Sequence, residues 1–171
     1  MDWMSLGPAI KAGGKTILMD PMKETHRCRS EKETMDLAAG MARKLKGGEV
    51  FALAGDLGCG KTTFVKGLAL GLQSPTTVTS PTFNLVHRYV GKQQTLIHYD
   101  LYRLKKIGEI EALDLETELH GGNILAIEWP QLVASILPEK RTRWIEFREV
   151  NDTEREVTIS LGIKTNRPDR S

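Results

Sequence analysis

A glycine-rich stretch in the first third of the sequence constrains the fold most. Residues 50–54 are all apolar, a run of the right length for one buried strand. Residues 55–62 follow with the spacing Gly-x-x-x-x-Gly-Lys-Thr, and an amphipathic helical pattern extends from there to about residue 72. The glycines let backbone N–H groups converge on phosphate oxygens, and the helix directs its positive dipole end to the same place. The order strand, loop, helix therefore predicts a phosphate-binding loop, or P-loop.

Three side chains of this loop carry specific expectations. Lys61 is expected to reach the β- and γ-phosphates of a nucleotide, and the hydroxyl of Thr62 is expected to bind Mg²⁺. Cys59 lies close to the helix N-terminus, where positive potential lowers the pKa of a thiol. Alkylation of Cys59 is therefore expected to block nucleotide binding, and bound ATP is expected to protect the thiol. The alternative, which the sequence favours, is a small residue that happens to be cysteine.

Length and composition limit the class of protein. A chain of 171 residues with 40% hydrophobic residues can form one core but not two ordinary domains. A net charge of +2 does not suggest the basic stripe of an autonomous nucleic-acid-binding protein. Cys28 and Cys59 lie far apart and suggest neither a disulfide framework nor a zinc site, which fits a reducing cytoplasm. No apolar run has the length of a membrane span, and the N-terminus lacks the apolar segment of a signal peptide, so we expect a soluble, cytoplasmic protein with no membrane partner.

The chain divides into a central domain and two flanking segments. Residues 1–22 contain several glycines and prolines without sustained periodicity, which predicts a poorly ordered N-terminal extension. Residues 23–163 form the predicted P-loop ATPase domain. Residues 164–171 are polar and are expected to form a frayed tail.

Strand and helix patterns alternate through the central domain. Ser30 and Glu33 form a capping-box pattern at the start of one helix, and the glycines at 47–48 end it. The other expected elements are strands at 26–29, 50–54, 83–89, 95–100, 124–127, 143–147 and 155–161, and helices at 61–72, 105–119 and 132–137. This order predicts an α/β fold: a single P-loop NTPase-like domain whose mainly parallel sheet is flanked by helices and has antiparallel strands at its edges.

Two of the predicted strands end in an acidic residue, Asp100 and Glu128. In open α/β sheets ligands bind beyond the carboxyl ends of the strands, so both acids are expected beside the P-loop. A nucleoside triphosphate with Mg²⁺ needs a hydroxyl on the metal, an acid near it and a group that orients the attacking water. Thr62, Asp100 and Glu128 together meet that need. The sequence leaves open which acid contacts the metal, and a helix cap or an exposed acid remains the alternative for each.

Two further positions are candidates at the same edge. Thr82 follows the P-loop helix, where nucleotide-hydrolysing proteins often carry a segment that senses the γ-phosphate. Its hydroxyl could approach the metal or the phosphate, or the segment could be a proline-stiffened turn. Trp129 directly follows Glu128 and could support the site or belong to the core.

In combination, the motifs resemble those of the bacterial TsaE (YjeE) family. The matching segments, in order and spacing, are Gly55–Thr63, Ser80–Thr82, His98–Leu104 and Glu128–Pro130, within a region from about His26 to Phe147. The resemblance implies an ATPase that uses ATP and Mg²⁺ and works with the TsaB and TsaD proteins. Their shared product would be N6-threonylcarbamoyladenosine at position 37 of tRNAs that read codons starting with A. In this family TsaD performs the transfer, and the ATPase is expected to drive or reset the complex.

The resemblance also implies roles for single residues. The implied phosphate-binding residues are Gly58, Cys59, Gly60, Lys61, Thr62 and Thr63. Thr62 and Glu128 would ligate Mg²⁺, Asp100 would support hydrolysis, and Trp129 would belong to the same edge. Ser30 corresponds to a position near the nucleotide. Cys59 stands where the family more often has alanine, and this position contributes mainly its backbone.

Three other functions share the P-loop. A small-molecule or nucleotide kinase needs an acceptor site and usually an arginine-bearing lid, for which Arg141 and Arg143 are the nearest candidates. A GTPase is suggested by Asn166–Asp169, which imitates a guanine-specificity motif almost at the end of the sequence. A nucleotide-dependent binding module would differ from a regulated ATPase because partner proteins would not raise its turnover.

Overall fold

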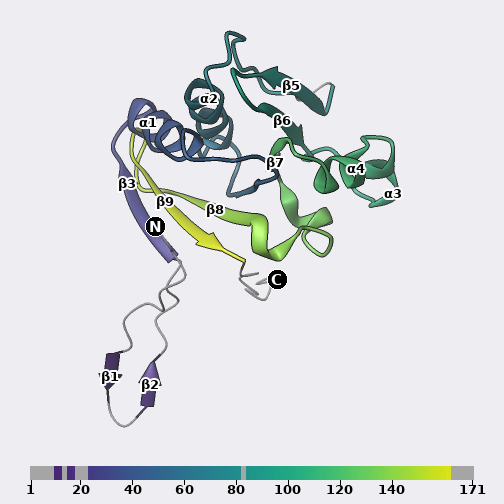
Figure 1. The fold of residues 1–171 in the computed structure, drawn as a ribbon. Coiled ribbons are helices and arrows are strands. Elements are labelled where there is room, and N and C mark those ends of the chain that lie inside the picture. The colour runs from purple at the N-terminus through teal and green to yellow at the C-terminus, as the bar shows by residue number, and fades with distance from the viewer. Residues whose placement is uncertain (1–9, 13–14, 18–22, 82–83, 163–171) are drawn as a thin grey trace.

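A seven-stranded sheet forms the centre of the computed structural model, which describes residues 10–12, 15–17, 23–81 and 84–162 (Figure 1). The strands lie in the order β3-β9-β8-β4-β7-β6-β5. Their bounds are β3 (Lys23–Cys28), β4 (Val50–Ala54), β5 (Val86–Val90), β6 (Thr95–Asp100), β7 (Ile124–Glu128), β8 (Thr142–Glu149) and β9 (Arg155–Leu161). Two short strands, β1 (Ile10–Ala12) and β2 (Lys15–Ile17), pair with each other in a separate two-stranded antiparallel sheet.

The middle of the sheet is parallel and its edges are antiparallel. Strand β4 pairs in parallel with β7 and β8, and β7 pairs in parallel with β6. Strands β5, β9 and β3 run antiparallel to their neighbours. All of β7 and nearly all of β4 are buried, as expected for parallel strands that are covered on both faces. The predicted fold class is confirmed.

Helices cover both faces of the sheet. Helices α1 (Glu31–Ala42) and α2 (Lys61–Gly71) lie side by side on one face (Figure 1), where Phe51 and Leu53 of β4 pack against them. Val50 of the same strand points to the other face, which is covered by the short helices α3 (Gly108–Glu111), α4 (Leu115–His120) and η1 (Pro130–Val133). The two-residue period of β4 thus supplies both halves of the core.

The start of α1 follows the sequence pattern. The side chain of Ser30 accepts a hydrogen bond from the backbone N–H of Glu33 (3.2 Å), and the Glu33 carboxylate accepts one from the N–H of Arg29 (2.8 Å). One N–H that the helix leaves unpaired, that of Glu33, and the N–H of the residue before the cap are therefore satisfied, in a variant of the capping box whose return bond reaches one residue further back.

The prediction of one helix over residues 105–119 is wrong. The chain forms α3 and α4 instead: α3 ends at Glu111, and Asp114, whose φ of 55° is left-handed, is the N-cap of α4 and interrupts the helical backbone between them. Burial explains the break: Leu115 and Leu119 pack into the core on α4, while Ile107 is 53% exposed.

Smaller differences concern the ends of elements. The helix expected at 132–137 is the 3₁₀ turn η1, which begins at Pro130, and a second turn, η2 (Glu139–Arg141), precedes β8. Strand β5 begins at Val86 rather than at residue 83, which lies outside the described residues. The domain boundaries stay a prediction, because most of segment 1–22 and all of 164–171 lie outside the described part as well.

None of the helices within the described ranges is both long enough and apolar enough to cross a bilayer.

Candidate functional site

The P-loop connects β4 to α2, and no side chain caps the start of that helix. Gly60 is the N-cap of α2 and has a φ of 109°, a left-handed conformation that favours glycine. No side chain caps this helix, so the N–H groups of its first turn are not bonded by a capping side chain. A helix start of this kind is an anion-binding position.

Lys61 lies on the inner side of the loop with 4% of its surface exposed. Its Nζ donates hydrogen bonds to the backbone oxygens of Gly55 and Asp56, each at 2.7 Å. The same nitrogen lies 4.2 Å from the ring centroid of Trp129, within range of a cation–π interaction. The loop after β4 and the residue after β7 therefore jointly fix the ammonium group.

Thr62 and Glu128 meet across the sheet edge. Oγ1 of Thr62, in the first turn of α2, donates a hydrogen bond of 2.8 Å to Oε1 of Glu128, the last residue of β7. Because the hydroxyl proton is used in this bond, the lone pairs of Oγ1 remain available to another ligand. His98 of β6 lies at the same carboxylate, with Nε2 at 2.9 Å from Oε1.

Asp100 ends the neighbouring strand and pairs in register with Glu128. The two acids consequently occupy the same edge of the sheet, and both are more than nine-tenths buried. The carboxylate of Asp100 accepts hydrogen bonds from the hydroxyl of Ser80 (3.3 Å) and from the backbone N–H of Tyr102 (3.1 Å). The alternative of a solvent-exposed acid is therefore excluded for Asp100 and Glu128, although Asp100 also stabilises the turn that follows β6.

A cavity of about 280 Å³ opens between these groups. Its lining residues are Leu57, Gly58, Gly60, Lys61, Thr62, Thr63, Ser80, Asp100, Tyr102, Arg103, Glu128 and Trp129. The structure thus brings eight sequence-predicted site residues to one cavity: Gly58, Gly60, Lys61, Thr62, Thr63, Asp100, Glu128 and Trp129. Three predicted residues are not among the lining residues: Ser30 caps α1, the side chain of Cys59 is buried, and Thr82 lies outside the described residues.

The thiol of Cys59 differs from its expectation. Only 2% of the residue is exposed, and its sulfur lies 3.6 Å from Nζ of Lys61. Burial raises the pKa of Cys59, and this effect outweighs the opposing influence of the Lys61 ammonium. The expectation of a lowered pKa is therefore wrong, because the side chain points into the core instead of toward the helix start.

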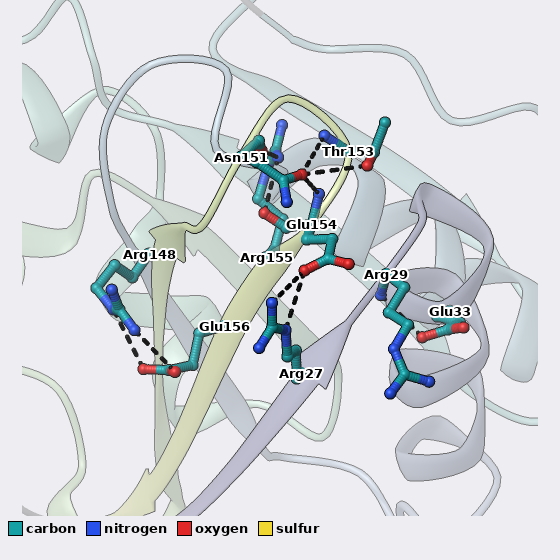
Figure 2. A network of polar contacts seen from close by, with 9 residues as sticks. All are labelled: Arg27, Arg29, Glu33, Arg148, Asn151, Thr153, Glu154, Arg155 and Glu156. Atoms are coloured by element: carbon teal, nitrogen blue, oxygen red, sulfur yellow. Dashed lines mark hydrogen bonds and ion pairs between the residues drawn. The ribbon is translucent and has the colours of Figure 1, made fainter.

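The turn between β8 and β9 contacts the P-loop from the other side. Nε of Arg155 donates a hydrogen bond to the backbone oxygen of Cys59 (3.2 Å), and its Nη1 donates one to the backbone oxygen of Asn151 (2.7 Å). Figure 2 shows Arg155 inside a wider polar network at this turn. In it, Arg27 of β3 bonds Glu154 at 2.5 and 3.0 Å and lowers the pKa of that carboxyl. Arg155, the first residue of β9, thereby links the P-loop to this turn, and Arg27 links the turn to β3.

The sequence interpretation missed His98 and Arg155. A signal existed for His98, because it precedes Asp100 by two residues and so faces the same side of β6. For Arg155 the sequence carries no comparable signal, since its contact joins residues 96 positions apart.

Comparisons of the sequence with known proteins point to one family. The sequence profile described as "Threonylcarbamoyl adenosine biosynthesis protein TsaE" matches residues 28–157. A tRNA threonylcarbamoyladenosine biosynthesis protein TsaE from Bacillus subtilis is 40% identical over 129 residues, which cover 75% of this chain and 80% of that protein. The protein of the same name from Treponema pallidum is 41% identical over 136 residues, covering 78% of this chain and 99% of that one.

A solved structure extends the likeness to the fold. The crystal structure of YdiB from Bacillus subtilis superimposes with a TM-score of 0.65 and 33% sequence identity, over 82% of this chain and 86% of that one. The matched region includes the P-loop and the strand-end acids, as well as the strands that place them. By sequence and fold, the chain belongs to the TsaE family, whose members are named for their part in the biosynthesis of threonylcarbamoyladenosine in tRNA.

Proposed function

We propose that this protein is an ATPase that hydrolyses ATP with Mg²⁺ and supports threonylcarbamoyladenosine formation at position 37 of tRNA together with TsaB and TsaD. One observation carries the proposal: the side chains of Lys61, Thr62 and Glu128 line one cavity at the open start of α2. The names of its relatives support the tRNA-modification role. We further propose a cytoplasmic location, which the two free cysteines support.

The P-loop would bind the phosphates of ATP. Backbone N–H groups of residues 58–63 would donate to phosphate oxygens at the start of α2. Lys61 has three N–H donors: two go to backbone oxygens and the third makes a long bond of 3.6 Å to the sulfur of Cys59. This weak third bond is the one that the β- or γ-phosphate would replace. Because these bonds and the Trp129 ring already fix the ammonium, little side-chain entropy would be lost when the nucleotide binds.

The oxygen atoms in the cavity fit Mg²⁺. The hydroxyl of Thr62 and the carboxylate of Glu128 would bind it, with Asp100 close by, and hard oxygen ligands are the ones this ion prefers. Over the described residues, no three His, Cys, Asp or Glu side chains group into a metal site. We propose that the protein supplies only part of the ligands of Mg²⁺ and that phosphate oxygens and water supply the others. When bound, the ion would neutralise negative charge on the β- and γ-phosphates.

Asp100 is our candidate for orienting the attacking water. Ser80 and the N–H of Tyr102 fix its carboxylate, so an oxygen of Asp100 could accept a hydrogen bond from water in a defined direction. The rings of Tyr102 and Trp129 lie 4.9 Å apart and line the same cavity. Tyr102 is 53% exposed, so a docked partner could bury this pair of rings and exclude bulk water from the cavity. In the isolated protein the pair stays uncovered, and we therefore expect slow turnover.

The alternatives receive less support. The guanidinium of Arg141 donates to the backbone oxygens of Gly48 (2.9 Å) and Leu119 (2.6 Å), so it ties loops together instead of forming a kinase lid. Arg143 lies on β8, with its guanidinium 5.8 Å from the ring of Phe51. The GTPase-like segment 166–169 lies outside the described residues. A net charge of +2 favours contact with tRNA through the complex over strong binding by this chain alone.

The test is ATP hydrolysis by the purified protein, alone and with TsaB and TsaD, beside a Lys61→Ala variant. We expect slow turnover alone, faster turnover with both partners and no turnover in the variant. Partner-independent turnover would contradict the tRNA-modification role, and phosphate transfer to a small molecule instead of water would favour the kinase.

A further inference from the structure

His98 is a buried polar residue that the proposed reaction does not yet use. It lies in the middle of β6 with none of its surface exposed and shares the α2-facing side of the strand with Asp100. In the register of the sheet it pairs with Ala126 of β7, two residues before Glu128. Its Nε2 lies 2.9 Å from Oε1 of Glu128.

The partners of the imidazole define its role. A carboxylate accepts hydrogen bonds, so Nε2 bears a hydrogen and donates a hydrogen bond to Oε1 of Glu128. Nδ1 has no hydrogen-bond partner within the described parts of the chain. A buried polar atom without a partner is uncommon in native proteins. The ring is therefore satisfied on one side only, and that side faces Glu128.

The bond to His98 restricts how Glu128 can turn. Oε1 accepts from Nε2 of His98 and from Oγ1 of Thr62, so two donors on different elements fix one carboxylate oxygen. The other oxygen, Oε2, has no such constraint from these two residues. The imidazole is fully buried and lies 6.4 Å, between ring centroids, from Tyr89, so its surroundings limit how the donor can move.

We propose that His98 is a positioning residue for the metal-binding carboxylate: its Nε2–H fixes Oε1 of Glu128 so that the carboxylate and the Thr62 hydroxyl present a preformed pair of oxygen ligands to Mg²⁺. The inference rests on the proposed Mg²⁺-ATP site. Partners that orient a ligating group from behind commonly influence metal affinity by about 10–100-fold.

Three variants of His98 separate positioning from packing. His98→Gln places an amide N–H near the position of Nε2, whereas His98→Asn is one methylene shorter and cannot reach Glu128. His98→Leu removes the donor and keeps an apolar side chain of similar size. Tyr89→Phe is the matched control, because it removes a buried hydroxyl bonded to Thr79 in the same part of the core without a hydrogen bond to Glu128.

For each variant we would measure the affinity for a fluorescent ADP analogue at increasing MgCl₂ concentrations and again in EDTA without Mg²⁺. Thermal unfolding of each variant would be recorded as well. We expect the Asn and Leu variants to need about 10-fold more Mg²⁺ for half of the metal-dependent gain in affinity, while binding in EDTA stays unchanged. The Gln variant and Tyr89→Phe should resemble the wild type. If the Leu variant does not fold, the comparison of Gln with Asn decides.

Two results would overturn the inference. One is that the Asn and Leu variants fold and need no more Mg²⁺ than the wild type for half of the metal-dependent gain in affinity. The other is an equal loss of affinity in EDTA and in MgCl₂, which would show a purely structural role. A wild-type protein without any Mg²⁺-dependent nucleotide binding would instead refute the proposed function itself.

Discussion

The packing of α1 on α2 yields a stability prediction with a built-in control. Gly67 lies in the middle of α2, the helix that begins with the P-loop, and faces α1. A Cβ added there would lie 2.7 Å from Cβ of Ala38 and 2.8 Å from Cα of Met35, and closer still to the Met35 carbonyl oxygen. Gly40 lies inside α1, and a Cβ added there would meet no atom within 4 Å.

The two Gly→Ala substitutions share one favourable effect and differ in one unfavourable effect. Replacing glycine by alanine inside a helix stabilises it by about 1 kcal/mol. At Gly67 the new methyl group meets backbone atoms that cannot rotate away, so we take the upper end of the overpacking cost, about 3 kcal/mol. We therefore expect Gly67→Ala to lower the free energy of unfolding by about 2 kcal/mol and Gly40→Ala to raise it by about 1 kcal/mol.

Urea unfolding followed by circular dichroism measures both values, and thermal melts should differ in Tm by about 6–12 °C between the variants. Because helix propensity cancels in the comparison, the difference isolates the close approach of the two helices. Equal stability of the two variants, or a more stable Gly67→Ala protein, would refute the packing argument.

Three further outcomes follow from single contacts. The Cys59 thiol, whose pKa is raised by burial, should react with iodoacetamide much more slowly in the native protein than in urea, and equal rates would contradict its buried placement. Burial also raises the pKa of Tyr99 from 10.0 to about 12, so between these pH values the unfolded chain binds fewer protons than the native one. The free energy of unfolding should then fall by about 1.4 kcal/mol per pH unit in this range, and it should fall less in Tyr99→Phe. Urea unfolding measured at several alkaline pH values would test this. Arg155→Met should weaken ATP binding by about 1 kcal/mol in calorimetry, because it removes the bond to the P-loop, whereas Arg148→Met on the same hairpin should not; equal effects would contradict the role of that bond.

Local patterns were sufficient for the parts of the site that each depend on one segment. The P-loop spacing needs only residues 55–62 and the elements on either side of it. The acids Asp100 and Glu128 were found because each ends an apolar strand, and parallel pairing then places them next to each other. The expected parallel centre and antiparallel edges followed from the same alternation of strands and helices.

The features that sequence patterns did not reveal depend on tertiary packing. The apolar spacing around residues 105–119 is helical throughout, yet Leu115 and Leu119 reach the core only after the chain breaks at Asp114. The pKa of Cys59 depends on whether its thiol faces the helix start or the core, which the loop sequence does not encode. The contact of Arg155 with the P-loop exists only because β9 returns beside β8.

Calorimetric titration of ATP in MgCl₂ into the wild-type protein and into Lys61→Ala tests the central claim most directly. The claim is that the cavity at the ends of β4, β6 and β7 binds ATP with Mg²⁺ through the P-loop. We predict saturable binding of a single ATP per chain in the wild type and its loss in the folded variant. Absence of binding to the wild type, or equal affinity in both proteins, would contradict the account.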